Sequence, residues 1–522
     1  MNRALSAKVT ACTAGVKRRG LLLIFAAVYL YAFPYFGLLR HANELPRILT
    51  TVQLAERGTF HLDERMADLG SRADIAATPA GHYFQNKTPG LSILALPIYY
   101  PFSLAFRAAG RSTTPLMFTT WLLRVGAVTV PCALFLAVFA RTARRFATSV
   151  EARNAALVAY ALGSMALPYG MLFMPHALAA ALVGTGFALA TKIARREARD
   201  ADKAAIAVGA LLGLATFIEY QAILGSVIVG AYAVLRAERP RRIAVMVAVA
   251  AAPFFAGLAI YHTVTFGSPV RTGYAYAVDP ANHVGFMGIV GPSQASVSQL
   301  LWRVDNGLLP LSPWVLLSIV GAVAIARDPA ARIRVGAEAV VAVLVVLVYC
   351  AFVAALEPEF GRAGWCVGPR YLAVSIPFFA WLAAAGLDAC LTQTALRAPA
   401  YALVLVGVGV HVLAATTYPH WPTQFENPLF EVSLRSLREG HAPHSLGTLV
   451  GLRGLASLAP LYVGIAALVV RLLAPARRHL LELVLAGLLA LFVVSRYESL
   501  ARTPRSVEAA DTWAFVQRTL EP

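Results

Sequence analysis

Long apolar runs recur along the whole chain and constrain it more than any other feature. Each run holds about 17–25 residues, which is the length that a helix needs to cross about 30 Å of hydrocarbon. Of the 522 residues, 58% are hydrophobic and 14% are charged, whereas soluble domains are about 45–50% apolar and about 25% charged. The sequence therefore excludes a disordered chain and an ordinary soluble enzyme, and it predicts an all-α integral membrane protein with about 13 transmembrane helices. The runs lie near residues 21–39, 116–139, 154–172, 176–193, 204–219, 221–236, 243–263, 309–326, 338–356, 370–390, 399–417, 449–472 and 479–496.

The basic residues predict the orientation of these helices. Lys and Arg number 45 against 27 Asp and Glu, a net charge of +18, which in a soluble protein would suggest nucleic-acid binding. Here they gather in short loops between apolar runs, as in loops retained in the cytoplasm, so no nucleic-acid partner is expected. All these loops share the side of the N-terminus if residues 91–109, interrupted by Pro97 and Pro101, form an outer interfacial helix rather than a span. The loops are 141–153, 192–203, 236–242, 326–334 and 474–479.

The chain is predicted to form one continuous membrane domain. Residues 1–260 make a transmembrane module that includes a first outer loop at 40–115, and residues 261–522 add helices with outer loops at 264–308 and 418–448. The first apolar run is longer than the core of a secretory signal, so we expect a retained helix with a cytoplasmic N-terminus in the cell (inner) membrane. Because the long polar segments lie outside, the active site is expected on the outer, periplasmic side.

The first outer loop carries candidate catalytic residues. Asn43 and Glu44 follow the first helix, and a carboxylate at the membrane boundary is a candidate general base, with Asp63 as the alternative. Lys87 precedes a Pro-Gly turn at the start of the interfacial helix, where an ammonium and free backbone N–H groups can meet a phosphate. Asn43, Lys87 and the nearby His82 are therefore candidates for substrate binding. The structural alternatives are a helix-end ion pair of Glu44 with Arg40 or Arg47, and a Lys87 that merely extends to the interface.

Polar residues also occur at the boundaries of later helices. Charges at such positions usually face a cavity or a partner, so each is a candidate for substrate binding. An arginine at a helix start beside Gly-Pro suits a phosphate oxygen, although an interfacial anchor or a capping histidine explains the same pattern. These candidates are Arg124, His176, Glu219, Tyr220, Arg370 and Tyr371. In the loop 264–308, Tyr274, Tyr276 and His283 fit either contacts with a sugar or an ordered lid without substrate contact.

Two of these motifs resemble a known family. Asn43-Glu44 after the first helix and GHYFQNKTPG at 81–90 look like the acidic pair and the Lys-Pro motif of the GT-C type of glycosyltransferase, which includes protein O-mannosyltransferases and lipid A aminoarabinose transferases. The resemblance covers about residues 20–235, and GPRYL at 368–372 matches more loosely. It implies a multi-pass cell-envelope enzyme that transfers a hexosyl or pentosyl group, with inversion, from a polyprenyl-phosphate donor to a hydroxyl of a lipid, glycan or protein. Lys87 and Arg370 would then stabilise the leaving phosphate.

Asn43 departs from the family pattern, which commonly has an aspartate there. An amide cannot accept a proton, so Glu44, Asp63 or Glu64 takes that role, or activity is altered or absent. No cofactor is required by the motifs, and a divalent metal is left open. Two other functions stay as alternatives: a transporter or flippase for a lipid-linked substrate, which would be expected to show internal repeats, and a non-catalytic membrane protein of the same fold.

Overall fold

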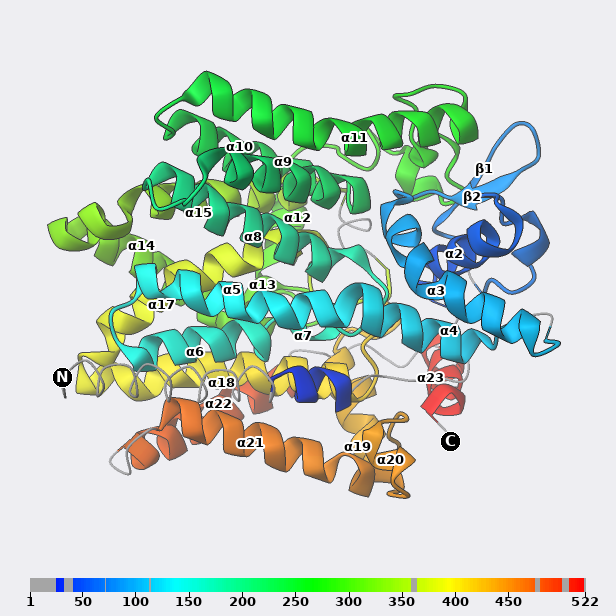
Figure 1. The fold of residues 1–522 in the computed structure, drawn as a ribbon. Coiled ribbons are helices and arrows are strands. Elements are labelled where there is room, and N and C mark those ends of the chain that lie inside the picture. Colours follow the sequence, from blue (N-terminus) through cyan, green and yellow to red (C-terminus); the bar gives the residue numbers. More distant parts are fainter. Residues whose placement is uncertain are drawn as a thin grey trace.

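The computed structural model describes residues 25–31, 41–70, 72–111, 114–357, 364–474, 479–499 and 507–520. Most of the predicted first helix at 21–39, residue Arg40 and residues 358–363 lie outside these ranges. Helices dominate the rest and pack side by side into one bundle (Figure 1).

The described part of the chain contains nine helical segments that are long and apolar enough to cross a membrane, and three shorter apolar helices. This supports a multi-pass membrane protein but does not establish the predicted count of 13. The helices of the bundle are α4 (Leu116–Leu123), which continues through the π-helical turn η2 (Arg124–Thr129) into α5 (Val130–Phe146), α6 (Val150–Ala161), α8 (Pro175–Ala194), α9 (Ala201–Ile218), α10 (Ala222–Leu235), α11 (Pro240–Phe266), α14 (Leu316–Arg327), α15 (Pro329–Ala354), α17 (Ile376–Leu391), α18 (Thr394–Thr416), α21 (Ala459–Leu473) and α22 (Leu480–Glu498).

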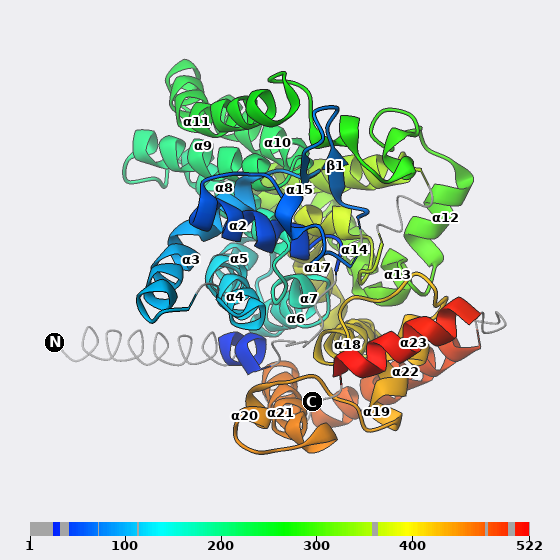
Figure 2. The ribbon, with the colours of Figure 1, turned by 90° about the vertical axis from the view of Figure 1, so that its right-hand side faces the viewer.

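The two ends of the bundle differ in what they carry. The connections α5–α6, α8–α9, α10–α11 and α14–α15, which hold predicted basic loops, gather at the left end in Figure 1. The first outer segment forms α2 (Leu45–Arg57), β1 (Ile75–Ala77), β2 (Tyr83–Gln85) and α3 (Gly90–Ala108) at the opposite end (Figures 1 and 2). The shared side of the basic loops agrees with the sequence prediction, and which end faces the cytoplasm stays a prediction.

The helix α3 lies with the outer-segment elements at one end of the bundle (Figure 1). Its length and composition would suffice for a span, but it contains Pro97 and Pro101. The last turn of this helix is followed by Gly110, whose φ of +75° suits the reversal toward α4. This position fits the predicted interfacial helix better than a transmembrane one.

The described residues are mostly helical, as predicted, and they also include a short two-stranded sheet. Strands β1 and β2 pair antiparallel with Ile75 opposite Gln85, and Gly81 at φ +86° closes the turn between them. Ile75 is fully buried and packs with Leu45 and Leu49 of α2. The first outer segment therefore has a small apolar core of its own, to which α2 and the hairpin both contribute.

The centre of the bundle is filled by aromatic rings from helices distant in sequence. Trp381 of α17 is fully buried and stacks on Phe139 of α5, with ring centroids 5.5 Å apart. Phe139 stacks in turn on Tyr160 of α6 at 4.6 Å. These rings fix α5, α6 and α17 against one another, and the polar cluster described next lies on the elements at one end of this core.

Candidate active site: a buried charged cluster at one end of the bundle

The turn at Lys87 is fastened to the end of helix α9. The Thr88 hydroxyl donates a 2.6 Å hydrogen bond to the carbonyl of Ile218, the last residue of α9. A Cβ atom on Gly90 would lie 2.1 Å from the carbonyl oxygen of Phe217, so only glycine permits this approach. The Lys-Thr-Pro-Gly sequence therefore brings Lys87 next to Glu219, which directly follows α9.

Lys87 forms a buried ion pair with Asp74, a residue that the sequence analysis did not select. Its Nζ lies 3.1 Å from Asp74 Oδ1, and it donates a 3.0 Å hydrogen bond to the hydroxyl of Tyr274. The amide of Asn43 donates to Asp74 Oδ2 at 2.9 Å. Burial alone would raise the pKa of Asp74, but Lys87, Arg370 and Arg47 lower it to about 2. Asp74 is therefore an ionised carboxylate held by two donors.

A second acid–base pair joins the start of α8 to the end of α9. His176 Nδ1 lies 3.0 Å from Glu219 Oε2, and both side chains are buried. Burial would raise the pKa of Glu219, but His176 and Arg47 lower it. The ring of His176 is set edge-on against Tyr371 at 6.1 Å. Glu219 is thus a charged acceptor beside a histidine, at the break between two helices.

Two buried arginines complete the cluster. Arg47 on the first turn of α2 donates a 2.6 Å hydrogen bond to the side-chain oxygen of Asn43. Arg370 begins the short helix η6 (Arg370–Ser375), and its guanidinium lies 5.2 Å from the ring centroid of Tyr371. Both arginines act on the charge of Asp74, which is why they contribute to its low pKa.

The cluster is short of hydrogen-bond acceptors. Its three cations, Arg47, Lys87 and Arg370, face two carboxylates, Asp74 and Glu219, so it carries one net positive charge with His176 neutral. In the part of the chain that the structure describes, the Nε atoms of Arg47 and Arg370 are buried without a hydrogen-bond partner. Buried donors are normally satisfied, so the arrangement is suited to an anionic ligand with several oxygen atoms.

This charge balance disfavours a divalent metal in the cluster. Each carboxylate already has a cationic or protonatable partner, and Asn43 offers an amide where a further carboxylate would be needed to attract a hard cation. The metal that the sequence analysis left open therefore has no suitable ligand set here.

Glu44, the predicted general base, occupies a different environment. Its fully buried carboxylate accepts two hydrogen bonds from Arg124, at 2.5 and 2.7 Å, and one from the backbone N–H of Phe173 at 2.7 Å. His420 Nε2 lies 3.5 Å from it. Burial opposes ionisation, but Arg124 lowers the pKa of Glu44 below its ordinary value. The carboxylate thus links α2 to the second span and is poorly placed to accept a proton from a substrate, although its catalytic role stays a prediction.

The remaining predicted residues are found in three places. Tyr220 lies beside the cluster, and its hydroxyl is 2.7 Å from His262 Nε2. Asp63, the alternative base, contacts His82 near the surface and not the buried cations around Asp74. His283 is exposed and hydrogen-bonds a backbone carbonyl. The structure therefore brings together six predicted residues: Asn43, Lys87, His176, Glu219, Arg370 and Tyr371.

The two cluster residues that the sequence analysis did not place there have recognisable signals. Arg47 stands in the first turn of α2, four residues after Asn43, and this spacing lets its guanidinium reach back to the Asn43 side chain. Asp74 stands opposite Asn86 across the hairpin, where the Asn86 N–H donates to the Asp74 carbonyl at 3.0 Å. Recognising the hairpin from its Thr-Pro-Ala-Gly turn would have placed Asp74 beside Lys87.

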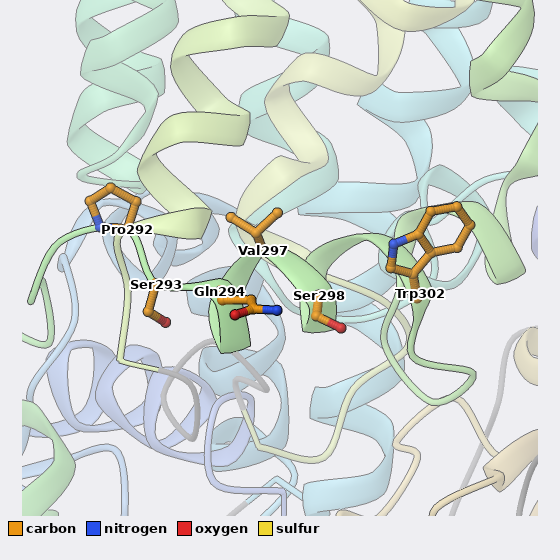
Figure 3. Close-up of a pocket in the computed structure, with 6 residues that line it drawn as sticks. All are labelled: Pro292, Ser293, Gln294, Val297, Ser298 and Trp302. Atoms are coloured by element: carbon orange, nitrogen blue, oxygen red, sulfur yellow. The ribbon is translucent and has the colours of Figure 1, made fainter.

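A separate groove of about 540 Å³ lies along α12 (Gln294–Trp302) in the outer loop (Figure 3). It is lined by Pro292, Ser293, Gln294, Val297, Ser298 and Trp302. The indole of Trp302 is largely exposed. Tyr274, by contrast, contacts Lys87 in the buried cluster and Tyr276 lies 3.0 Å from Arg271. The aromatic residues of this loop therefore do not converge on one site.

Comparisons with known proteins give similarity in structure alone. No family model matches the chain, and no curated protein matches it significantly. Among solved structures, ArnT from Cupriavidus metallidurans in the apo state has a TM-score of 0.48 and 15% identity over 93% of this chain and 78% of that one. ArnT from the same organism bound to undecaprenyl phosphate has a TM-score of 0.48 and 14% identity, over 93% of this chain and 78% of that one. A third structure is the oligosaccharyltransferase AglB from Archaeoglobus fulgidus, in complex with an inhibitory peptide and a dolichol-phosphate. It has a TM-score of 0.40 and 12% identity, over 96% of this chain and 59% of that one. Similarity at this level does not identify a reaction.

Proposed function

We propose that this protein is a membrane glycosyltransferase that moves a sugar from a polyprenyl-phosphate donor to an acceptor hydroxyl. The observation that carries this proposal is the convergence of Arg47, Lys87 and Arg370 beside Asp74, with buried N–H groups that lack acceptors. A sugar–phosphate–prenyl phosphodiester carries one negative charge, which matches the single positive charge in excess. The sequence motifs around Lys87 supply the substrate class.

The cations bind the donor phosphate and stabilise it as it leaves. When the bond between the anomeric carbon and the phosphate oxygen breaks, that oxygen gains negative charge. Arg370 and Arg47 can each donate from the Nε atoms that now lack a partner, and Lys87 can turn from Asp74 toward the new charge. Donors that are already fixed in place favour this step because they need no reorganisation during the reaction.

Asp74 is the general base of this proposal, in place of Glu44. The bound phosphate neutralises the cations that depress the pKa of Asp74, so this pKa rises toward its ordinary range as the donor binds. Asp74 then accepts the proton of the acceptor hydroxyl while the hydroxyl oxygen bonds to the anomeric carbon. Attack from the face opposite the phosphate inverts that carbon. Glu44 keeps its carboxylate in the pair with Arg124.

The placement of the cluster agrees with a lipid-linked donor. It lies where α2, the hairpin and the start of α3 meet the bundle, at the end away from the basic loops (Figure 1). By the positive-inside rule this end faces the outside of the cell membrane. A prenyl chain would then remain among the apolar helices while its phosphate reaches the cations, and the acceptor would approach from outside.

The decisive experiment uses the purified full-length chain in lipid nanodiscs with a panel of polyprenyl-phosphate sugars. Release of polyprenyl phosphate and sugar transfer to hydroxyl acceptors are measured by mass spectrometry. Asp74→Asn should still bind the donor but lose about 100- to 10,000-fold in turnover, which is the usual contribution of a general base. Asp279→Asn, on an outer-loop turn, is the control and should keep full turnover.

Three results would contradict the proposal. The first is that no donor in the panel binds. The second is that Asp74→Asn turns over as fast as the unmodified protein. The third is that reconstituted liposomes show movement of the intact lipid-linked sugar without cleavage. The last result would favour the flippase alternative. A chain that binds the donor and neither cleaves nor moves it would instead be the non-catalytic member of this fold.

A further inference from the structure

We propose that His61, Asp63 and His82 form a zinc-type metal site at the outer edge of the hairpin. Asp63 Oδ2 lies 3.3 Å from His61 Nδ1 and 2.8 Å from His82 Nδ1. The three potential ligand atoms all lie within 4.8 Å of one another. Two imidazole nitrogens and one carboxylate oxygen are a usual ligand set for Zn²⁺ and similar borderline divalent cations.

The two separations that involve Asp63 lie near the value for tetrahedral coordination, and the two histidine nitrogens lie within 4.8 Å of each other. Ligands at about 2.0–2.1 Å from Zn²⁺ stand roughly 3.3 Å apart along the edges of a tetrahedron. The separation between Asp63 and His61 already has this value, and the one between Asp63 and His82 is shorter by a few tenths of an ångström. A small rotation of the His82 ring, whose side chain is 46% exposed, would admit the ion and leave a fourth position open to solvent.

The ligands are held in place by interactions that a metal would not disturb. Asp63 Oδ1 accepts a 2.6 Å hydrogen bond from the Tyr83 N–H. The Leu62 N–H donates to the Tyr83 carbonyl at 2.8 Å. The ring of His61 packs edge-on against Phe84 at 5.0 Å. Fixed carboxylate and ring orientations reduce the cost of ordering a site when the ion arrives.

The charges around Asp63 favour a cation bound by the histidines. Its acidic neighbours have arginine partners, since Glu64 pairs with Arg57 at 2.8 Å and Asp68 with Arg65 at 3.4 Å. Asp63 itself pairs with the two histidines. This differs from the buried cluster, where the ammonium of Lys87 already pairs with Asp74. A metal cation would be repelled by that lysine beside Asp74, whereas the neighbours of Asp63 are histidines that can bind it.

A metal here would connect the segment after α2 to strand β2. That strand runs into Asn86 and Lys87, so the metal would fix the base of the element that carries the donor-binding lysine. The inference concerns metal binding and the stability of this segment, and it stands whether or not the chain transfers a sugar.

The test is a Co²⁺ and Zn²⁺ titration of the full-length protein in detergent, after removal of any affinity tag and treatment with a chelator. Co²⁺ should bind as a single ion per chain and give the visible absorption of a four-coordinate site, and Zn²⁺ should displace it and raise the thermal midpoint. His82→Ala and Asp63→Asn should each weaken binding at least about 100-fold, because loss of an outer partner alone typically costs about 10- to 100-fold. His283→Ala, which removes an exposed outer-loop histidine, is the matched control and should bind as the unmodified protein does.

Equal binding by His82→Ala and by the unmodified protein would overturn the inference and would mean that the ion binds adventitiously elsewhere. Absence of the four-coordinate absorption would also overturn it, leaving a hydrogen-bonded His–Asp–His group. No sugar donor is used, so failure here is distinguishable from failure of the proposed transferase activity.

Discussion

The ion pair between Glu44 and Arg124 is predicted to be a structural element, and Glu44→Gln tests this directly. The carboxylate is fully buried and accepts two hydrogen bonds from Arg124 and one from the Phe173 N–H. Glutamine keeps the shape of the side chain but leaves the Arg124 charge buried without its counter-charge. Breaking a buried pair in this way costs about 3–5 kcal/mol. We expect Glu44→Gln to lower the free energy of unfolding by an amount in this range.

A double-mutant cycle separates this structural role from catalysis. Arg124→Met alone strands the Glu44 carboxylate and should also destabilise the protein by about 3–5 kcal/mol, whereas the double variant removes both charges. The destabilisation of the double variant should therefore be smaller than the sum of the two single-variant destabilisations by at least about 2 kcal/mol. The assay is unfolding of the purified protein by titration with SDS, followed by intrinsic tryptophan fluorescence.

Two outcomes would refute the reasoning. A coupling energy near zero would mean that the two side chains do not stabilise each other in the folded protein. A Glu44→Gln protein as stable as the unmodified one, with full donor binding but no turnover, would return the role of general base to Glu44 and remove it from Asp74.

Three further predictions test the cluster. Lys87→Met should weaken binding of polyprenyl phosphate about 10- to 150-fold, the range for loss of one charged hydrogen bond, in an equilibrium binding assay in which Lys203→Met, exposed on α9, shows no change. The pKa of Asp74 is lowered from 3.8 to about 2, so its ionised form contributes roughly 2 kcal/mol of stability above pH 5, which is lost as the pH falls toward 2. Between pH 7 and pH 3, the thermal midpoint should fall more for the unmodified protein than for Asp74→Asn. Parallel curves for the two proteins would contradict this prediction. Gly90→Ala places a Cβ atom 2.1 Å from a backbone oxygen of α9 and should displace the lysine turn and reduce donor binding, whereas Gly409→Ala, with open space around it, should bind normally.

The lengths of the apolar runs and the positions of the basic loops predicted the bundle well. Apolar runs and short basic loops depend on local composition, and the structure places helices over the runs it describes and the basic loops at one end. The prediction of an interfacial helix at α3 followed from the same loops, because counting it as a span would have inverted the later ones. The count of 13 is a weaker inference, because a run of given length forms a span, a broken helix or an interfacial helix according to its neighbours.

The site was predicted only where a local motif marked it. Lys87 and Arg370 stand at Pro-Gly and Gly-Pro turns, which single them out, and both act on the charge of Asp74. Their part in binding a substrate stays a prediction. Glu44 was also at a marked position, but the partner of a side chain depends on which neighbour its face of the helix meets, and here that neighbour is Arg124. Asp74 has no motif of its own. Its place follows from pairing across a hairpin, which a search for helices alone does not consider.

The excess positive charge of the cluster links its stability to its proposed use. Three buried cations opposed by two carboxylates cost free energy in the folded protein, because no partner offsets the desolvation of the third charge. An anion that binds only the folded protein stabilises it by about 2.7 kcal/mol at a concentration of 100 times its dissociation constant. A phosphate-bearing lipid should therefore raise the thermal midpoint of the unmodified protein, and less so in Arg370→Met, where the charges already balance. A neutral prenyl alcohol should raise neither, because it carries no negative charge to satisfy the buried guanidinium groups.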